Sequence, residues 1–305
     1  RALLVSKLPL WEIHTYQDFE KYLDLQLERL QTDHLDICLL HSLCMKKWQK
    51  CLKIGVFDFL NKAKADGKIL MTGFSIHDTT ETMKAVLDSY DWDMMLMQYN
   101  YYDRFHQVEE KGLRYAASKN VAVMIMEPLR GGMLAKNIPD KVEAALATVM
   151  PQAKHHEKAF AWLYDQPEVT VILSGCVNME QLQDNIRIFA NAQSNIFNEE
   201  EKEDFDQARL AWKENIMVPC TACGYCLACP LHLDIPGIFK LYNDRAGDKV
   251  QLENRNLLYK NIYTIVNKDA TQCISCRKCT QLCPQSLDIP TILAQAHQAM
   301  TAPIE

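Results

Sequence analysis

The sequence lacks the features that mark several classes of protein. Its net charge is -6, so it has no excess of positive charge that would attract nucleic acid or an anionic membrane surface. It has no apolar run of the roughly 18 to 20 residues that a membrane span needs. Its first residues lack the long apolar core of a signal peptide. We therefore expect neither nucleic acid nor a membrane as a partner, and the sequence predicts a cytoplasmic protein.

Cysteine is plentiful but unevenly placed. Of the 12 cysteines, four are scattered, and the rest lie after residue 219 in two tight runs. Disulfides belong mainly to small secreted domains, whereas clustered thiols in a cytosolic chain indicate a metal site. A metal-binding region near the carboxyl end is predicted.

The first two thirds of the chain alternate short apolar runs with amphipathic stretches. The apolar runs predict strands at residues 2–6, 35–40, 69–74, 94–98, 121–126 and 169–173. Helices are expected at 15–31, 55–66, 79–90, 107–119, 155–165 and 179–190, the first with a Thr15–Asp18 capping pair. This alternation predicts an α/β fold with a parallel sheet.

A TIM-type (β/α)8 barrel and an open doubly wound sheet both fit this pattern. No GxGxxG motif follows any strand, which counts against a dinucleotide-binding fold. Six units do not close an eight-stranded barrel, and the run ALLVS at residues 2–6 already resembles a buried strand. If the fold is a barrel, we expect an N-terminally truncated one, with two strand–helix units missing upstream of Arg1.

Polar residues stand where the predicted strands end, which is where a barrel places its active site. Alone, a Lys or His is usually structural, Gln98 and Asn100 are able to cap a strand, and Ser75 to cap a helix. Lys7 and His41, however, follow apolar strands at equivalent positions, which favours a functional role. The strand-end residues are Lys7, His41, Ser75, His77, Gln98, Asn100, Glu127, Pro128, Ser174 and Gly175.

Several segments closely resemble consecutive signature segments of the aldo-keto reductases. They include VSKLP, LQTDHLDICLLHSL, MLMQYNYYD, VMIMEPLRGGML and VILSGCVNMEQLQDNI, and they cover residues 1 to about 190. The whole chain is similar to the bacterial and archaeal branch that carries a C-terminal iron-sulfur domain. The resemblance implies hydride transfer between NAD(P)H and a small-molecule carbonyl or alcohol.

The resemblance also assigns residues to the reaction. Lys7 and His41 fall on two of the family's four catalytic positions, as the cation that lowers the pKa of a Tyr and as the group that orients the carbonyl. The other two, an Asp and a Tyr, lie upstream of the first strand in the family and are absent from this sequence. The chain as given is therefore expected to be a poor reductase.

The same resemblance implies a cofactor site. Ser75 and Gln98 match its carboxamide-binding positions, Met126 stands where an aromatic residue often stacks, and Ser174 and Gln181 replace the basic residues of NADP-specific members. NAD, NADP and a flavin all stay open. The pyrophosphate loop would contain Pro128, Leu129 and Gly131, and the adenosine end Gly175, Gln181, Asp184 and Asn185.

After an acidic, solvated helix at 199–215, the last part of the chain contains an internal duplication. CTACGYCLACP is followed by CISCRKCTQLCP, and LDIP recurs at 233–236 and 287–290. The second run is the CxxCxxCxxxCP spacing of bacterial ferredoxins, and the first is one residue shorter. Zinc also takes four thiolates, but its sites usually pair two CxxC units across a longer gap, so iron-sulfur clusters are favoured.

Two [4Fe-4S] clusters are predicted. In two-cluster ferredoxins the fourth Cys of each motif binds the other cluster. One cluster would take Cys220, Cys223, Cys226 and Cys283, and the second Cys273, Cys276, Cys279 and Cys229.

The predicted organisation is a partial barrel at 1–197, a connecting helix at 198–219 and a mostly α-helical two-cluster ferredoxin-like domain at 220–305. The function expected first is an oxidoreductase of aldo-keto reductase type. Its clusters either relay electrons, with a ferredoxin-like protein as partner, or stabilise the domain. The alternative is an electron-transfer or binding protein whose barrel is not catalytic.

Overall fold

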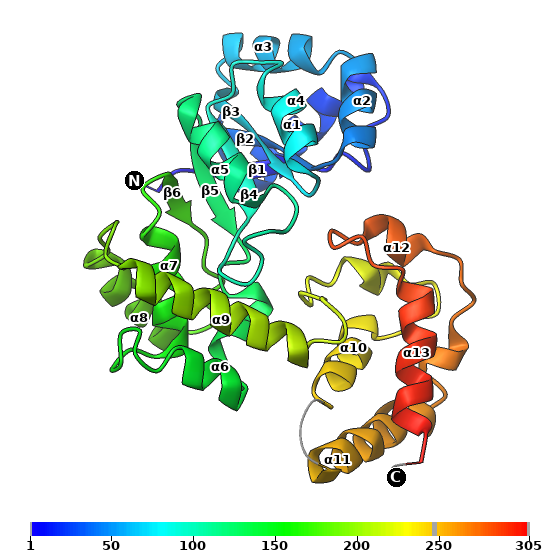
Figure 1. The fold of residues 1–305 in the computed structure, drawn as a ribbon. Coiled ribbons are helices and arrows are strands. Elements are labelled where there is room, and N and C mark those ends of the chain that lie inside the picture. Colours follow the sequence, from blue (N-terminus) through cyan, green and yellow to red (C-terminus); the bar gives the residue numbers. More distant parts are fainter. Residues whose placement is uncertain (1, 246–248, 304–305) are drawn as a thin grey trace. The chain divides into compact units, whose positions relative to one another are not determined.

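The computed structural model describes residues 2–245 and 249–303 and divides into two compact units (Figure 1). The first contains residues up to 129 and 152–202, and the second contains 130–151 and 203–305. This division differs from the expected boundaries, because 130–151 belongs with the cysteine-rich region. Two side-chain bonds attach this segment there: Lys141 Nζ donates to Glu214 over 2.6 Å, and Thr148 Oγ1 donates to Asp204 over 2.6 Å.

The first unit is built on a parallel sheet. Among the described residues it has six strands in the order β1-β2-β3-β4-β5-β6, and every neighbouring pair is parallel. The predicted fold class is therefore confirmed. The strands are β1 (Val5–Leu8), β2 (Leu35–Leu43), β3 (Ile69–Ile76), β4 (Met94–Gln98), β5 (Ala122–Met126) and β6 (Val169–Ile172).

Helices alternate with these strands as the periodicity predicted. The Thr15–Asp18 capping box is present, with the Thr15 N–H donating to Asp18 Oδ2 over 2.8 Å. α2 was not predicted, because it is short and follows directly on β2. The helices are α1 (Tyr16–Leu30), α2 (Met45–Lys53), α3 (Val56–Ala65), α4 (Thr80–Leu87), α5 (Glu109–Ser118), α7 (His155–Tyr164) and α8 (Met179–Ala190).

One face of the sheet carries an inward layer of apolar side chains from three strands. Ile37 and Leu39 of β2, Leu96 of β4 and Met124 of β5 form one buried cluster, and the half-buried Met126 packs against it. Residues at alternate positions of a strand point to the same face. Such a layer is the packing expected inside a barrel of parallel strands.

The two strands at the ends of the order have a neighbour on one side only. Val5 on β1 is 38% exposed, and Val171 on β6 and Leu173 after it are 37% and 39% exposed. These apolar side chains stand open because no described strand pairs with the outer sides of β1 and β6. The prediction of about six β/α units is confirmed.

Helices are the only regular elements among the described residues of the second unit. Its long helix α9 (Glu199–Asn215) begins in the first unit and continues into the second. Each LDIP repeat starts a helix as predicted, α10 and α13, with Asp at the N-cap and Pro in the first turn. The remaining elements are η1 (Arg130–Ala135), α6 (Asp140–Ala145), η2 (Tyr225–Ala228), α10 (Ile235–Asn243), α11 (Lys249–Tyr259), η3 (Lys260–Thr264), η4 (Ala270–Gln272), α12 (Lys278–Leu282) and α13 (Ile289–Thr301).

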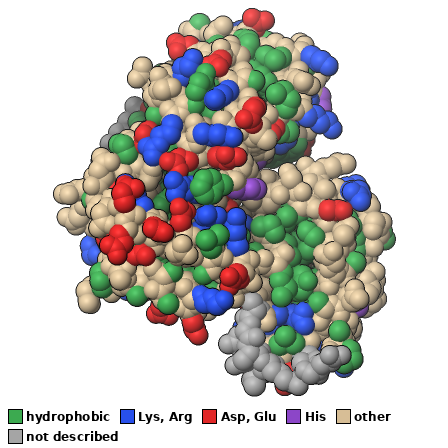
Figure 2. Space-filling model, in the orientation of Figure 1, with side chains coloured by type: hydrophobic (Ala, Val, Ile, Leu, Met, Phe, Trp, Pro, Cys, Tyr) green, Lys and Arg blue, Asp and Glu red, His purple; other side chains and the backbone are tan. Residues whose placement is uncertain are grey.

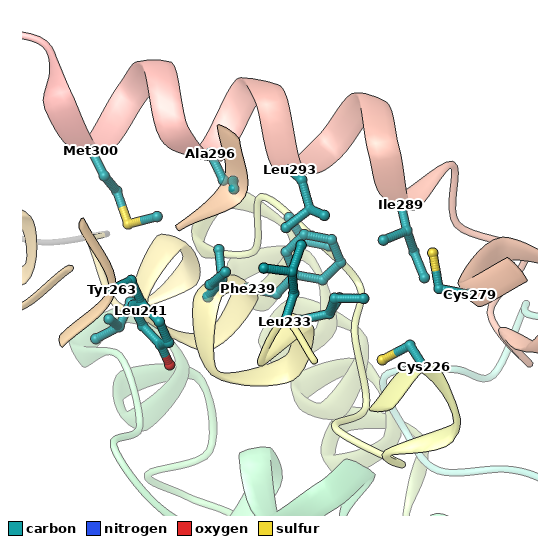
Figure 3. Packing of buried hydrophobic residues seen from close by; sticks show 14 of the residues in the cluster. Cys226, Leu233, Phe239, Leu241, Tyr263, Cys279, Ile289, Leu293, Ala296 and Met300 are labelled. Carbon is teal, nitrogen blue, oxygen red and sulfur yellow. The ribbon is translucent and has the colours of Figure 1, made fainter. Parts of the chain in front are cut away.

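A small apolar core holds these helices together. Leu293 and Ala296 of α13 are fully buried and face Phe239 of α10 (Figure 3). Cys226 and Cys279 lie at the end of this core where α13 begins (Figure 3). The cysteine segments are therefore attached to the same core that joins the two LDIP helices.

The duplication is visible in the backbone as well as in the sequence. Left-handed conformations recur at equivalent positions of the two cysteine segments, although only one of these residues is a glycine. Both segments therefore follow the same path. The equivalent pairs are Ala222 and Ser275, Gly224 and Arg277, and His232 and Ser286.

The surface of the first unit mixes charges of both signs. Figure 2 shows basic and acidic side chains interspersed over its visible face. Several pair directly, such as Lys62 with Glu20 over 2.8 Å and Lys68 with Asp24 over 2.6 Å. Within residues 2–245 and 249–303, no helix is both long enough and apolar enough to cross a membrane.

Candidate active site and cysteine cavities

The first group of predicted site residues lies on β1, β2 and β3. Lys7, His41 and Ser75 were expected just past their strands, but they lie within the strands, close to the carboxyl ends. The reason is that β1 begins later, and β2 and β3 run further, than their apolar runs indicate: Lys7 pairs with Leu39, and Leu43 with Ile76. All three residues still lie near the carboxyl ends of neighbouring parallel strands.

His41 occupies an environment that keeps its imidazole neutral. Burial lowers its pKa to about 4, and the positive charges of Lys7 and Lys47 add to this effect. Its ring lies 5.1 Å from that of Trp11, centroid to centroid. A neutral imidazole has one N–H to donate, so His41 is suited to orient a carbonyl oxygen near neutral pH.

Burial lowers the pKa of two further residues whose charges act on His41. Burial also lowers the pKa of His77 to about 4, and His77 Nδ1 lies 3.2 Å from Gln107 Oε1. Lys47 was not singled out from the sequence. Its Nζ donates to Ser42 O over 2.7 Å and to Ser42 Oγ over 3.2 Å, and burial lowers its pKa. The only sequence signal for Lys47 is its place on α2, the helix that periodicity missed.

Ser75 is a structural link between two strands. It is 1% exposed, and its Oγ accepts a hydrogen bond from the Ser42 N–H over 2.6 Å. Ser42 has a left-handed φ of 55°, in the irregular pairing between Leu40 and Leu43. Ser75 therefore holds the bulge that follows His41.

Gln98 belongs to a buried amide–carboxylate network. Its Nε2 donates to Asp103 Oδ2 over 2.7 Å, and Asn100 Nδ2 donates to the same oxygen over 3.0 Å. Asn100 also donates to Glu127 O over 2.9 Å, which connects the segment after β4 with the segment after β5. Asp103 was missed, because nothing in the sequence marks it as the partner of both amides.

The predicted pyrophosphate loop, 128–132, crosses the boundary between the two units. Pro128 is buried and Leu129 half-buried, and both belong to the first unit. Arg130 and Gly131 belong to the second unit.

The predicted adenosine-end residues cluster where α8 begins. Gln181 Oε1 accepts from the Val177 N–H over 2.9 Å, and Asn185 Nδ2 donates to Ser174 Oγ over 2.8 Å, so both hold the loop around the exposed Gly175. The Asn178 side chain caps the helix. This loop follows β6, whereas Lys7 and His41 lie on β1 and β2, at the other end of the strand order.

Asp184 faces basic partners. His156 Nε2 lies 2.8 Å from its Oδ2, and Arg187 Nη2 donates to its Oδ1 over 2.6 Å. Hydrogen bonds from Arg187 and His156 hold the pKa of Asp184 below its usual range. Glu157 lies near enough to form a three-ligand group with His156 and Asp184, but Arg187 also pairs with Glu157 over 3.0 Å. The guanidinium of Arg187 therefore already pairs with both carboxylates of this group.

The eight late cysteines line two cavities in the second unit, and each cavity takes three from one motif and one from the other. Buried apolar residues complete both, with Phe239 beside the first and Leu293 beside the second. The first is lined by Cys220, Cys223, Cys226 and Cys283, and the second by Cys273, Cys276, Cys279 and Cys229.

Equivalent cysteines have matching burial. Cys226 and Cys279 are each 8% exposed, and Cys223 and Cys276 are both exposed. Burial raises the pKa of the Cys226 thiol to about 12, so binding a metal there requires release of a proton. Four thiols around each apolar cavity are a donor set that fits an iron-sulfur cluster.

Two protein-family models match the chain. Residues 2–207 match the model described as "Aldo/keto reductase family", and residues 219–287 match that of the "4Fe-4S dicluster domain". Among curated proteins, subunit alpha 1 of an acetyl-CoA decarbonylase/synthase complex from Methanosarcina mazei is 36% identical over 84 residues. That stretch is 27% of this chain and 8% of the subunit.

Solved structures of similar fold include aldo-keto reductases. AKR11C1 from Bacillus halodurans, in its holo form, has a TM-score of 0.57 at 20% identity, with 68% of this chain and 71% of that chain covered. An aldo/keto reductase from Klebsiella pneumoniae, in complex with NADP and acetate, has a TM-score of 0.54 at 23% identity, with 68% and 69% covered. At these identities the likeness concerns the fold.

Proposed function

Because this chain belongs to the aldo/keto reductase family, with a 4Fe-4S dicluster domain after the barrel, we propose that it is an iron-sulfur oxidoreductase acting on a small carbonyl or alcohol. The hydride would be exchanged with a nicotinamide cofactor. The iron-sulfur half of the proposal is carried by one observation, the two cavities that each take four cysteines across the duplication.

On the barrel side, the protein's own residues would orient the substrate. The neutral His41 imidazole would donate a hydrogen bond to the carbonyl oxygen, and the Lys7 ammonium would favour negative charge developing near it. Ser75 and Gln98 would face the carboxamide end of the cofactor, and Gly175, Gln181, Asp184 and Asn185 its adenosine end. A nicotinamide, when bound, supplies the hydride.

In the second unit, two [4Fe-4S] clusters would be held as the cavities arrange the thiols: Cys220, Cys223, Cys226 and Cys283 for one, and Cys273, Cys276, Cys279 and Cys229 for the other. A cluster accepts or gives one electron at a time, whereas a hydride carries two. The clusters would therefore serve exchange with a one-electron donor or acceptor protein of ferredoxin type.

Metal analysis of the anaerobically purified chain tests the cluster half. We expect about eight irons and eight sulfides per chain, with a broad visible absorbance. A colourless protein that contains zinc would refute this half of the proposal.

A screen tests the reductase half. NADH, NADPH and reduced ferredoxin are offered as donors against aldehydes and quinones, with Lys7→Met and His41→Phe as variants. General acid–base groups contribute roughly 10²- to 10⁴-fold, so each variant should lose activity on that scale. Reading the codons upstream of Arg1 for an in-frame Asp and Tyr tests the proton donor separately.

The alternative function is an electron-transfer protein whose barrel binds a ligand without catalysis. It is favoured because two expected cofactor contacts already form hydrogen bonds within the protein. Ser75 Oγ accepts from the Ser42 N–H, and Gln98 Nε2 donates to Asp103. If the codons upstream of Arg1 encode no Asp and Tyr at the expected positions, and reduced ferredoxin reduces the protein while no donor supports carbonyl reduction, the alternative is preferred.

A further inference from the structure

The turn after β5 lies against the first cysteine of the first motif. Arg130 is only 2% exposed, and its Nη2 donates a hydrogen bond to Pro219 O over 3.2 Å. Pro219 directly precedes Cys220, and the two bonded residues are 89 positions apart in the chain. The guanidinium therefore fixes the peptide group that leads into Cys220.

Gly131 contacts the residue on the other side of the same cysteine, at the peptide group between Thr221 and Ala222. A Cβ at position 131 would lie less than 3.0 Å from Thr221 O, and Thr221 is itself only 4% exposed. The φ of Gly131 is +65°, in the left-handed region. Glycine at 131 is therefore required twice, by its backbone conformation and by the close approach of the Thr221 carbonyl.

Gly132 provides the comparison. Its φ of +91° is also one that side chains rarely adopt, but nothing lies within 4 Å of a Cβ built there. The two adjacent glycines share the conformational requirement, and only Gly131 has the contact with the cysteine segment.

We propose that the turn Arg130–Gly132 positions Cys220 and thereby sets the reduction potential of the cluster bound through Cys220. The inference rests on the proposed binding of iron-sulfur clusters. Cluster potentials depend on nearby charge, on hydrogen bonding around the ligands and on solvent exposure. A guanidinium charge beside the ligand favours the reduced cluster, which carries one more negative charge.

The test is a redox titration of the complete, cluster-loaded chain, with dithionite as the one-electron reductant and electron paramagnetic resonance as the readout. Cys223→Ser and Cys276→Ser assign the two signals, since each lines a different cavity. Gly131→Ala should change the reduced-to-oxidised ratio of the Cys220 cluster by tenfold or more, about 59 mV for a one-electron couple. Gly132→Ala brings the same conformational strain without the contact with Thr221, so it should change this ratio less than Gly131→Ala does.

Arg130→Met tests the charge, and Lys136→Met, which removes an exposed charge from the same segment, is its matched control. Arg130→Met should lower the potential of the Cys220 cluster alone, and Lys136→Met should move neither cluster. Equal effects of the two alanine variants, or unmoved potentials in both Gly131→Ala and Arg130→Met, would overturn the inference. A chain without iron would overturn the proposed function as well, whereas two unmoved signals would overturn this inference alone.

Discussion

The hydroxyl of Tyr263 donates a hydrogen bond to Asp234 Oδ2 over 2.7 Å, and the other carboxylate oxygen of Asp234 caps α10 by accepting from the Gly237 N–H over 3.0 Å. One carboxylate thus joins the start of α10 to η3. A Cβ on Gly237 would meet both the Asp234 carboxylate and the Tyr263 hydroxyl.

Gly237→Ala should therefore destabilise the second unit. Losing hydrogen bonds to a charged group costs about 1.5–3 kcal/mol, and alanine returns about 0.5–1 kcal/mol in helix propensity. We expect a net loss of about 1 kcal/mol, read as a lower thermal midpoint of the anaerobic protein. Gly175→Ala is the control, because nothing lies within 4 Å of a Cβ added there. An unchanged midpoint in Gly237→Ala would contradict the prediction.

Ser75→Ala should weaken the sheet beside His41. It leaves the Ser42 N–H without its acceptor, and a partly buried donor without a partner costs about 1–3 kcal/mol. The measurement is the free energy of unfolding in urea, with Ser6→Ala on β1 as the control. Equal stability of Ser75→Ala and the unaltered chain would show that Ser42 finds another acceptor.

Acid should destabilise the protein through His41 and His77. Burial lowers the pKa of each to about 4 from an ordinary value of 6.5, so the unfolded chain binds more protons between these values. Stability contributed by the neutral imidazoles is present above pH 6.5 and is lost as the pH falls towards 4.

The double variant His41→Gln, His77→Gln should therefore lose less stability than the unaltered chain between pH 6.5 and 4. The measurement is the free energy of unfolding across that range. Parallel curves for the two proteins would mean that the folded and unfolded histidines titrate alike.

The fourth cysteine of each motif lines the cavity of the other motif, so cysteine variants can test which cysteines bind which cluster. Cys223→Ser and Cys283→Ser should alter the same cluster signal, because both line one cavity, and Cys276→Ser and Cys229→Ser should alter the other. The exposed Cys176→Ser, in the first unit, is the control. If Cys229→Ser and Cys223→Ser alter the same signal, each motif binds its own cluster.

Sequence reasoning worked best where one short segment holds the whole signal. The strand and helix alternation, the Thr15–Asp18 cap and the cysteine spacing are local patterns, and they anticipated the parallel sheet and the two helical repeats. The start of β1 was misplaced, because only Val5 and Ser6 of the apolar run ALLVS pair with β2, and the pairing continues through Lys7.

Side-chain contacts that depend on how the chain packs could not be predicted. Asp103 joins Gln98 and Asn100, Lys47 joins Ser42, and Arg130 reaches Pro219 across 89 positions. None has a spacing rule, because each depends on how the elements pack. For the same reason, the assignment of 130–151 to the cysteine-rich unit was not foreseen.

The open ends of the sheet bear on how this chain behaves in concentrated solution. β1 and β6 are four residues long, and along their outer sides backbone donors and acceptors lack a neighbouring strand among the described residues. Such edge strands can pair with an extended peptide from another molecule, which then adds a strand to the sheet. Because one such edge lies at each end of the described strand order, strands could be added at both.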